Sequence, residues 1–296
     1  MFGAILFGLL AAFAQSCSYI FSKRYIAGGG GSFQLLLCAH LVMGLFSVVL
    51  LLFLIPYVPI PPLQQYWWPL IACSLFYLIG QFSFFMALKH AEASRLSPLL
   101  ALKIVIVALL SISFYGGSCN AWQLLAVLLC VGGAMLSNWS GGTVSRLGLI
   151  YLISACFWYS WSDIYIKKLI TALDSGHTAS GVLAAALSYL LTGAVAVLFL
   201  KMINKPAKKD IPIIIGFSVV WYSGVMFLFV CFMLSNPIFG NILQSSRGII
   251  SVLLGAWLAH RGYSYLETKI SRNMVIKRVF AALLMTLAVI LFVLDS

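Results

Sequence analysis

Lys103 and Arg247 have the clearest capacity for chemistry, because each is a cation inside a long apolar segment. A cation near the middle of a bilayer costs roughly 2.5–3.5 kcal/mol on insertion scales, so such a residue usually faces a cavity and has a function. Both side chains are able to bind a carboxylate or a phosphate. The alternatives are that they snorkel to the membrane surface, or that they pair internally with Asp163 or with backbone carbonyls.

Polar side chains recur at helical spacing in three of the apolar segments. The members of these three stripes are Gly240, Gln244, Arg247 and Ser251; Gln15, Ser18 and Ser22; and Ser74, Tyr77 and Gln81, with Phe84 on the same face. Each residue taken alone is equally well explained by a hydrogen bond between helices. Together the three stripes predict a hydrated central cavity lined by polar groups.

Asp163 is the only acid well inside an apolar segment, and its candidate roles are counter-ion, proton carrier or ligand for a substrate amine. The alternative is local, since Lys167 lies four residues further on and would form an ion pair along the same helix. Trp158 lies deep in the same segment, where its ring could stack on a substrate, although helix packing is the more common role. His40 is expected to be a packed histidine rather than a proton relay.

The composition explains why charges inside apolar segments are informative. Of the 296 residues, 63% are apolar and 8% are charged, and the mean hydropathy is +1.08. Soluble proteins average roughly 45–50% apolar and about 25% charged residues. We therefore expect an integral membrane protein, not a soluble enzyme, a disordered chain or a secreted disulfide scaffold. The net charge of +12 is attributed to membrane orientation, and no nucleic-acid partner is expected.

Loop-forming residues divide the chain into ten apolar segments. The segments are 2–22, 33–55, 67–88, 96–115, 122–139, 147–168, 178–200, 212–234, 237–259 and 275–294. Most of them are long enough to cross about 30 Å of hydrocarbon as a helix. The predicted fold class is an all-α integral membrane protein with ten transmembrane helices.

The chain matches itself when it is shifted by 144 residues, which indicates an internal repeat. The matched pairs include Ala11 and Ala155, Ser16 and Ser160, Ser18 and Ser162, Gly80 and Gly224, and Lys103 and Arg247. Because the repeat unit has five spans, the second copy (145–296) crosses the membrane in the opposite sense to the first (1–144). Two inverted five-helix repeats are typical of alternating-access transporters, whose site lies near the midplane between the halves.

The basic residues are distributed unevenly among the loops. Fourteen Lys and Arg residues follow odd-numbered spans, whereas Lys167 and Lys168 follow an even-numbered one. The positive-inside rule then places both termini outside the cytoplasm. The short loops favour the inner membrane of a bacterium. No HExxH, GxSxG, paired-carboxylate or CxxC pattern occurs, so no enzyme, metal or cofactor is expected.

Two further stretches carry a resemblance to a known family. The run 91–102, with Ser97-Pro98, and the run 123–136, with Gly132-Gly133, resemble the fourth and fifth spans of the drug/metabolite transporter superfamily, EamA-like family. The five-plus-five arrangement is similar over the whole chain. Where the family often has Gly-Glu after the fourth span, this chain has Gly116-Gly117-Ser118. The resemblance implies a carrier of small organic metabolites with cytoplasmic termini, opposite to the orientation from the charge count.

The sequence as a whole predicts a secondary transporter, monomeric or homodimeric, that moves a small polar metabolite across the bilayer by alternating access. An amino acid or a related zwitterion or anion is the favoured substrate, and a proton or another ion is the candidate coupling partner. The residues predicted to bind the substrate are Arg247, Lys103, Gln244, Ser251, Gln15, Gln81, Tyr77, Asp163 and Trp158. Two alternatives stay open: a carrier of phosphorylated metabolites or nucleotides, and a lipid-handling protein whose basic loop 260–274 contacts anionic head groups.

Overall fold

The computed structural model describes residues 1–88, 102–115, 120–138, 145–174 and 179–247, together with isolated residues at 90, 100 and between 250 and 291. Within these ranges every regular element is a helix, so the predicted all-α class is confirmed there. The elements are α1 (Phe2–Ala27), α2 (Ser32–Leu54), α3 (Leu63–Leu88), α5 (Leu102–Tyr115), α6 (Ala121–Asn138), α7 (Arg146–Ala172), α8 (Ser180–Leu198), η1 (Leu200–Met202), η2 (Lys208–Asp210), α9 (Ile211–Leu234) and α10 (Pro237–Ser245).

The helices coincide with the predicted apolar segments wherever the chain is described. The helix predicted over 96–115 is described from residue 102 onward, and the one predicted over 237–259 is described as far as α10 and the residues directly after it. The tenth segment, 275–294, is described only at isolated residues between 277 and 291, each of which is helical. Helix α1 extends beyond its apolar segment to Ala27, past Lys23 and Arg24.

Five of the described helices are long and apolar enough, by length and composition, to cross a bilayer: α1, α2, α3, α8 and α9. Helices α5 and α6 add two shorter apolar stretches. Because lipid offers no hydrogen-bond partners, a spanning segment must satisfy its own backbone groups, and a helix does so internally. The described part of the chain is therefore that of a multi-pass membrane protein.

Local sequence accounts for several helix boundaries. Helix α1 is followed by Gly29, whose φ of 90° is in a region that side chains other than glycine rarely adopt. Helix α7 begins after Ser145, whose side chain accepts a hydrogen bond from the amide of Gly148. Helix α10 begins after Asn236, whose side chain accepts from the amide of Phe239.

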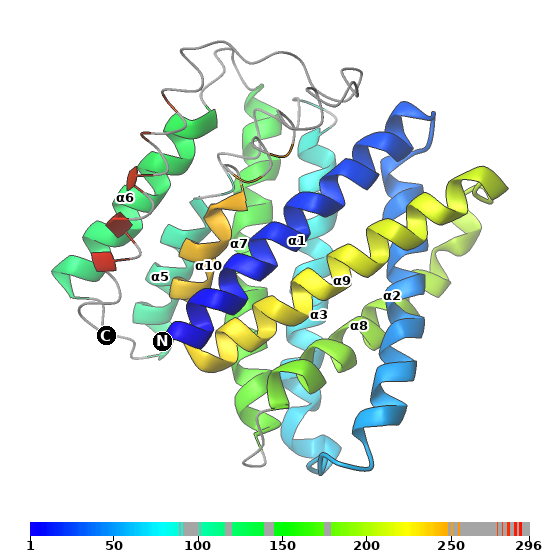
Figure 1. Cartoon of the computed structure of the whole chain (residues 1–296), viewed down its shortest axis with the longest axis horizontal. Coiled ribbons are helices and arrows are strands. Elements are labelled where there is room, and N and C mark those ends of the chain that lie inside the picture. Colours follow the sequence, from blue (N-terminus) through cyan, green and yellow to red (C-terminus); the bar gives the residue numbers. More distant parts are fainter. Residues whose placement is uncertain are drawn as a thin grey trace.

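Helices that are distant in sequence lie side by side in three pairs (Figure 1). Helix α1 packs along α9, α3 packs along α7, and α2 packs along α8. In addition, α5 contacts α7, and α10 contacts α1. Each of these pairs joins a helix of residues 1–144 to a helix of residues 145–296, so the two predicted halves are packed together along most of their helices.

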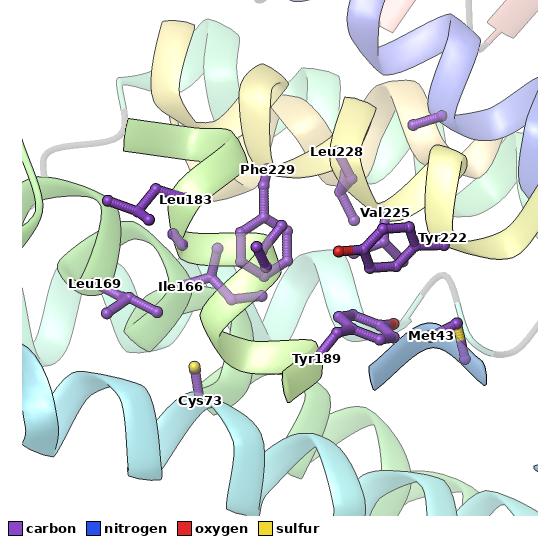
Figure 2. Close-up of a cluster of buried hydrophobic side chains, with 14 of the residues drawn as sticks. Met43, Cys73, Ile166, Leu169, Leu183, Tyr189, Tyr222, Val225, Leu228 and Phe229 are labelled. Carbon is purple, nitrogen blue, oxygen red and sulfur yellow. The ribbon is translucent and has the colours of Figure 1, made fainter. Parts of the chain in front are cut away.

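The largest apolar core lies between α2, α3, α7, α8 and α9 (Figure 2). Met43 of α2 and Leu183 of α8 are fully buried in it, and Phe229 of α9 is nearly so. Tyr189 and Tyr222 also belong to this core. The aromatic residues give it a polar component, because the Tyr222 hydroxyl lies 2.7 Å from the hydroxyl of Ser47. The core fixes α2, α8 and α9 against one another.

Helices α2 and α8 approach each other closely at two glycines, Gly44 and Gly193. A Cβ on Gly193 would lie 2.8 Å from the Cα of Gly44 and 3.0 Å from the carbonyl oxygen of His40. These neighbours are backbone atoms, so the rotation of a side chain cannot relieve the clash. Small residues allow such close helix contacts in membranes, where packing drives association.

The substitution Gly193→Ala is therefore expected to lower the free energy of unfolding by about 1–3 kcal/mol through overpacking. Gly132→Ala is the matched control, because a Cβ on that helical glycine would meet no atom within 4 Å. The measurement is thermal unfolding of both purified variants in the same detergent. Equal melting temperatures for Gly193→Ala and the wild type would contradict the close contact.

Candidate functional site

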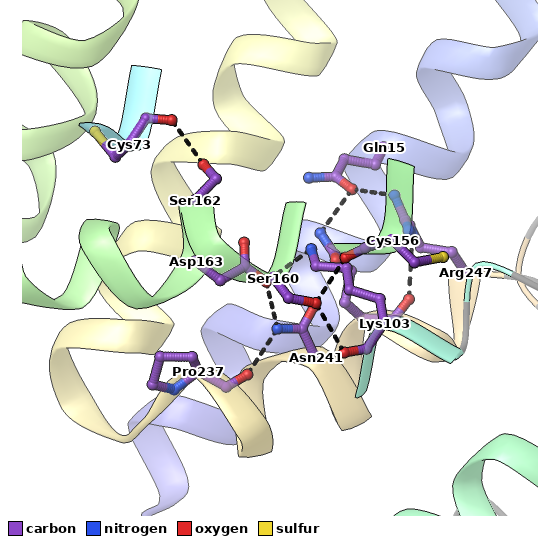
Figure 3. Close-up of polar contacts among 11 residues, drawn as sticks. Gln15, Cys73, Lys103, Cys156, Ser160, Ser162, Asp163, Pro237, Asn241 and Arg247 are labelled. Carbon is purple, nitrogen blue, oxygen red and sulfur yellow. Dashed lines mark hydrogen bonds and ion pairs between the residues drawn. The ribbon is translucent and has the colours of Figure 1, made fainter. Parts of the chain in front are cut away.

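Asp163 of α7 is paired with Lys103 of α5 (Figure 3). The Lys103 Nζ lies 2.7 Å from Asp163 Oδ2, and the side chains are 14% and 6% exposed. Asn241 of α10 donates to the same carboxylate oxygen at 2.6 Å and to the carbonyl of Pro237 at 2.8 Å. An ion pair this deeply buried is tolerated because the carboxylate receives a further hydrogen bond. Three helices thus meet at one carboxylate.

Arg247, two residues beyond the end of α10, is held by amide groups rather than by an acid. Its guanidinium donates to Gln15 Oε1 of α1 at 2.7 Å, and its Nε donates to the carbonyl of Gln244 at 3.2 Å. The Gln244 side chain donates to the same Gln15 oxygen at 3.0 Å. Among the described acids, none lies within ion-pair distance of Arg247. Among the described residues, Arg247 is thus hydrogen-bonded but has no acid as a partner.

Two serines hold the backbone beside the two cations. Ser160 of α7 donates to the carbonyl oxygen of Lys103 at 3.1 Å, and Ser16 of α1 donates to that of Arg247 at 3.2 Å. Each hydroxyl is also 2.7 Å from the carbonyl four residues earlier in its own helix. The main chain at each cation is therefore attached to a neighbouring helix from the other half of the chain.

Tyrosines extend the polar region away from the cations. The Lys103 ammonium lies over the ring of Tyr159, 5.6 Å from its centroid. The rings of Tyr159 and Tyr77 are 6.2 Å apart, and the Gln81 side chain donates to the Tyr77 hydroxyl at 2.9 Å. Tyr189 donates to that hydroxyl at 3.4 Å. Tyr77 and Gln81 thus form a second group, connected to Lys103 through Tyr159.

The predicted site residues therefore separate into groups. Gln15, Gln244 and Arg247 are brought together, as are Lys103 and Asp163. Trp158 lies apart from them, where its ring stacks on Phe76 with centroids 5.3 Å apart. This contact fits helix packing, the more common role. Ser251 lies outside the described residues, and so does the basic loop 260–274.

The alternative prediction for Asp163, an ion pair with Lys167 along the same helix, is wrong. The Lys167 ammonium instead donates to three carbonyl oxygens at the end of α9: those of Phe232 at 2.7 Å, Met233 at 3.2 Å and Ser235 at 2.7 Å. A helix C-terminus carries unpaired carbonyls and a partial negative charge, which attract a cation. Lys167 thus fastens α7 to the end of α9.

Lys167→Met is expected to lower the free energy of unfolding by about 2 kcal/mol, because it leaves these carbonyls without their charged donor. Thermal unfolding in detergent measures the effect. Lys201→Met serves as the control, since Lys201 is exposed in the short helix η1. If both variants melted together with the wild type, Lys167 would contribute nothing to the α7–α9 contact.

His40 of α2 is a packed histidine, as expected. Its Nδ1 lies 2.8 Å from the carbonyl oxygen of Leu36, and its ring stacks on Tyr189 at 5.9 Å with an angle of 6°. Among the buried side-chain nitrogens and oxygens described, its Nε2 is the one without a hydrogen-bond partner. Over the same residues, no group of three His, Cys, Asp or Glu side chains is arranged to hold a metal ion.

Sequence reasoning missed two contributors to the site. Asn241 binds the Asp163 carboxylate, and its position three residues before Gln244 on a helix was an available signal. Tyr159, which lies under Lys103, stands four residues before Asp163 and 144 residues after Gln15. Both helical spacing and the repeat therefore pointed to it.

The arrangement defines a class of protein: a helical membrane bundle that keeps charged and amide side chains between its spans. Residues 2–139 match the EamA-like transporter family, so the family resemblance is confirmed and this part of the chain belongs to that family. The family consists of membrane transporters, so the match over residues 2–139 indicates a membrane transporter.

The fold is also known from solved structures. One crystal structure is similar to this chain with a TM-score of 0.74 and 17% sequence identity, covering 99% of this chain and 99% of the other. At this identity the likeness shows a shared fold over the full length and nothing about substrates. Comparison with curated proteins gives no match.

Proposed function

We propose that the protein is a secondary transporter, not an enzyme, that moves a small polar organic metabolite by alternating access. The favoured substrate is an amino acid or a related zwitterion or anion, and its acidic group binds Arg247 with Gln15 and Gln244. The observation that carries the proposal is the uncompensated guanidinium of Arg247, 2.7 Å from an amide oxygen and without a described acid beside it. A half-buried cation of this kind is well suited to bind a carboxylate.

Two inverted halves, 1–144 and 145–296, form the proposed transport unit. Supporting this, the bond from Ser160 to the Lys103 carbonyl and the bond from Ser16 to the Arg247 carbonyl relate residues that are 144 apart. The helix pairs follow the same relation, because shifting each segment by one repeat converts the α1–α9 pair into the α7–α3 pair. Inverted repeats of this type alternate the opening of a shared site between the two sides.

Glycine positions give independent support for this symmetry. A Cβ on Gly80 of α3 would lie 2.7 Å from the Tyr159 ring, and a Cβ on Gly224 of α9 would lie 2.9 Å from Gln15 Cγ. Gly80 and Gly224 are 144 residues apart, and so are Gln15 and Tyr159. Each half thus uses a glycine to make room for a side chain beside its cation.

The proposed setting is the inner membrane of a bacterium, with a proton or another ion as the coupling partner and a monomer or homodimer as the working form. A carrier of phosphorylated compounds is the second candidate. It is favoured by the presence of two cations, Lys103 and Arg247, each able to bind a phosphate oxygen.

The test is a thermal-shift screen of the detergent-purified protein against amino acids, organic acids, sugar phosphates, nucleotides and quaternary amines. A ligand that binds only the folded state raises the melting temperature in a concentration-dependent way. Compounds that stabilise the protein are then supplied to proteoliposomes, where uptake is measured. Stabilisation by amino or organic acids, followed by saturable uptake, is expected. Stabilisation only by neutral or cationic compounds would overturn the proposed role of Arg247.

A further inference from the structure

The two intramembrane cations occupy matching positions but have different partners. Lys103 and Arg247 are 144 residues apart, and each is attached through its carbonyl to a serine of the other half. Lys103 nevertheless contacts the carboxylate of Asp163, whereas Arg247 contacts the neutral amide of Gln15. Within the described residues, one member of the pair thus has an acid as its partner and the other does not.

The acid beside Lys103 comes from a position at which the two repeats differ. The position equivalent to Asp163 in the first half, 144 residues earlier, is Tyr19, which carries no acid. The other two described acids, Asp174 and Asp210, lie at or beyond helix ends rather than within spans. Lys103 and Arg247 contribute two positive charges and Asp163 one negative charge, so the described cluster has a net charge of +1.

We propose that Asp163 sets the charge of the transported compound, restricting it to ligands with a single anionic group. This inference rests on the proposed function, because it takes Arg247 as the ligand-binding cation. Asp163 occupies the place on Lys103 that a second anionic group would need. A dianion would therefore bring its second charge toward the Asp163 carboxylate, and like charges placed together inside an interface repel each other.

The low exposure of the Asp163 and Lys103 side chains strengthens the effect of their charges on a bound ligand. The Asp163 side chain is 6% exposed and that of Lys103 is 14% exposed, so little water is present to screen either charge. The close-up in Figure 3 shows Asp163, Lys103 and Arg247 in one cluster. The Asn241 amide holds the carboxylate oriented toward Lys103, with 2.6 Å between its nitrogen and the carboxylate oxygen.

The experiment compares matched pairs of monoanions and dianions: succinamate with succinate, and glutaramate with glutarate. Apparent Kd values come from the concentration dependence of the melting temperature in detergent. The wild type is expected to bind the monoanion of each pair more tightly. In Asp163→Asn, which raises the cluster charge to +2, the ratio of the two Kd values is expected to move toward the dianion by at least about tenfold.

The double variant Lys103→Gln/Asp163→Asn keeps the test decisive if Asp163→Asn does not fold. Its cluster charge is again +1, so it is expected to retain the wild-type preference for monoanions. An unchanged Kd ratio in Asp163→Asn, or a shift toward dianions in the double variant, would overturn the role of Asp163 while leaving the carrier proposal intact. If no monoanion stabilised the wild type, the role of Arg247 and this inference would fail together.

Discussion

Replacing Arg247 by glutamine is expected to lower the uptake of an anionic substrate into proteoliposomes by about 100-fold, because the charge opposite the substrate acid is removed. This substitution removes the charge but keeps a hydrogen-bond donor at position 247. A glutamine at position 247 places its amide nitrogen where Arg247 Nε now donates to the carbonyl of Gln244 at 3.2 Å. A polar donor is thus kept at this point of the chain while the charge is lost.

Arg247→Lys is the companion variant for the same measurement. Lysine keeps the positive charge but lacks the planar fork with which arginine binds a carboxylate and an amide at once. We expect uptake between that of the wild type and that of Arg247→Gln, with the loss mainly in apparent affinity. Lys201→Gln, an exposed charge removal, controls for a general effect of net charge. Wild-type kinetics in Arg247→Gln would show that the substrate does not contact this cation.

The grouping of Arg247, Gln244 and Gln15 was predictable because it depends on short-range rules. Residues three positions apart on a helix share a face, so Gln244 and Arg247 had to point in similar directions. The polar stripe of α1 then supplied the partner that an apolar span must provide for a buried polar group. What the sequence did not contain was the identity of that partner, since α1 and α10 are more than 200 residues apart along the chain.

The partner of Asp163 shows where sequence reasoning reaches its limit. The pairing with Lys167 is visible in the sequence, because residues four apart on a helix are neighbours. The pairing with Lys103 depends on the packing of α5 against α7, which no local pattern encodes. Asp163 pairs with Lys103 of the neighbouring helix, while Lys167 reaches the carbonyl groups that α9 leaves unpaired at its end.

Trp158 illustrates the difference between depth in a membrane and direction around a helix. It is five residues from Asp163, which at 3.6 residues per turn places the two about 140° apart on α7. Tyr159 is four residues from Asp163 and therefore shares its face, under Lys103. Depth along the segment suggested Trp158 as a site residue, whereas the angular position around α7 places Tyr159 beside Lys103.

Lys103→Gln is expected to have the largest effect on stability, lowering the free energy of unfolding by about 3–5 kcal/mol. The reason is the Asp163 carboxylate, which would keep its negative charge in a site that is 6% exposed. The one partner remaining to that oxygen among its described contacts is the Asn241 amide at 2.6 Å. A single neutral hydrogen bond does not offset the cost of burying a charge without a counter-ion.

Adding Asp163→Asn to Lys103→Gln is expected to recover most of this loss. The double variant places two amides where the ion pair stood, so no uncompensated charge is left, and buried ion pairs are often replaceable by neutral groups at small cost. Unfolding of the wild type, both single variants and the double variant gives the coupling energy of the pair. A double variant as unstable as the sum of the two single variants would contradict a direct pairing. Recovery of stability in the double variant would show that the Asp163 carboxylate destabilises the fold only when Lys103 is absent. The ion pair would then add little to the stability of the wild type, and the reason for an acid at position 163 would lie in its effect on the ligand.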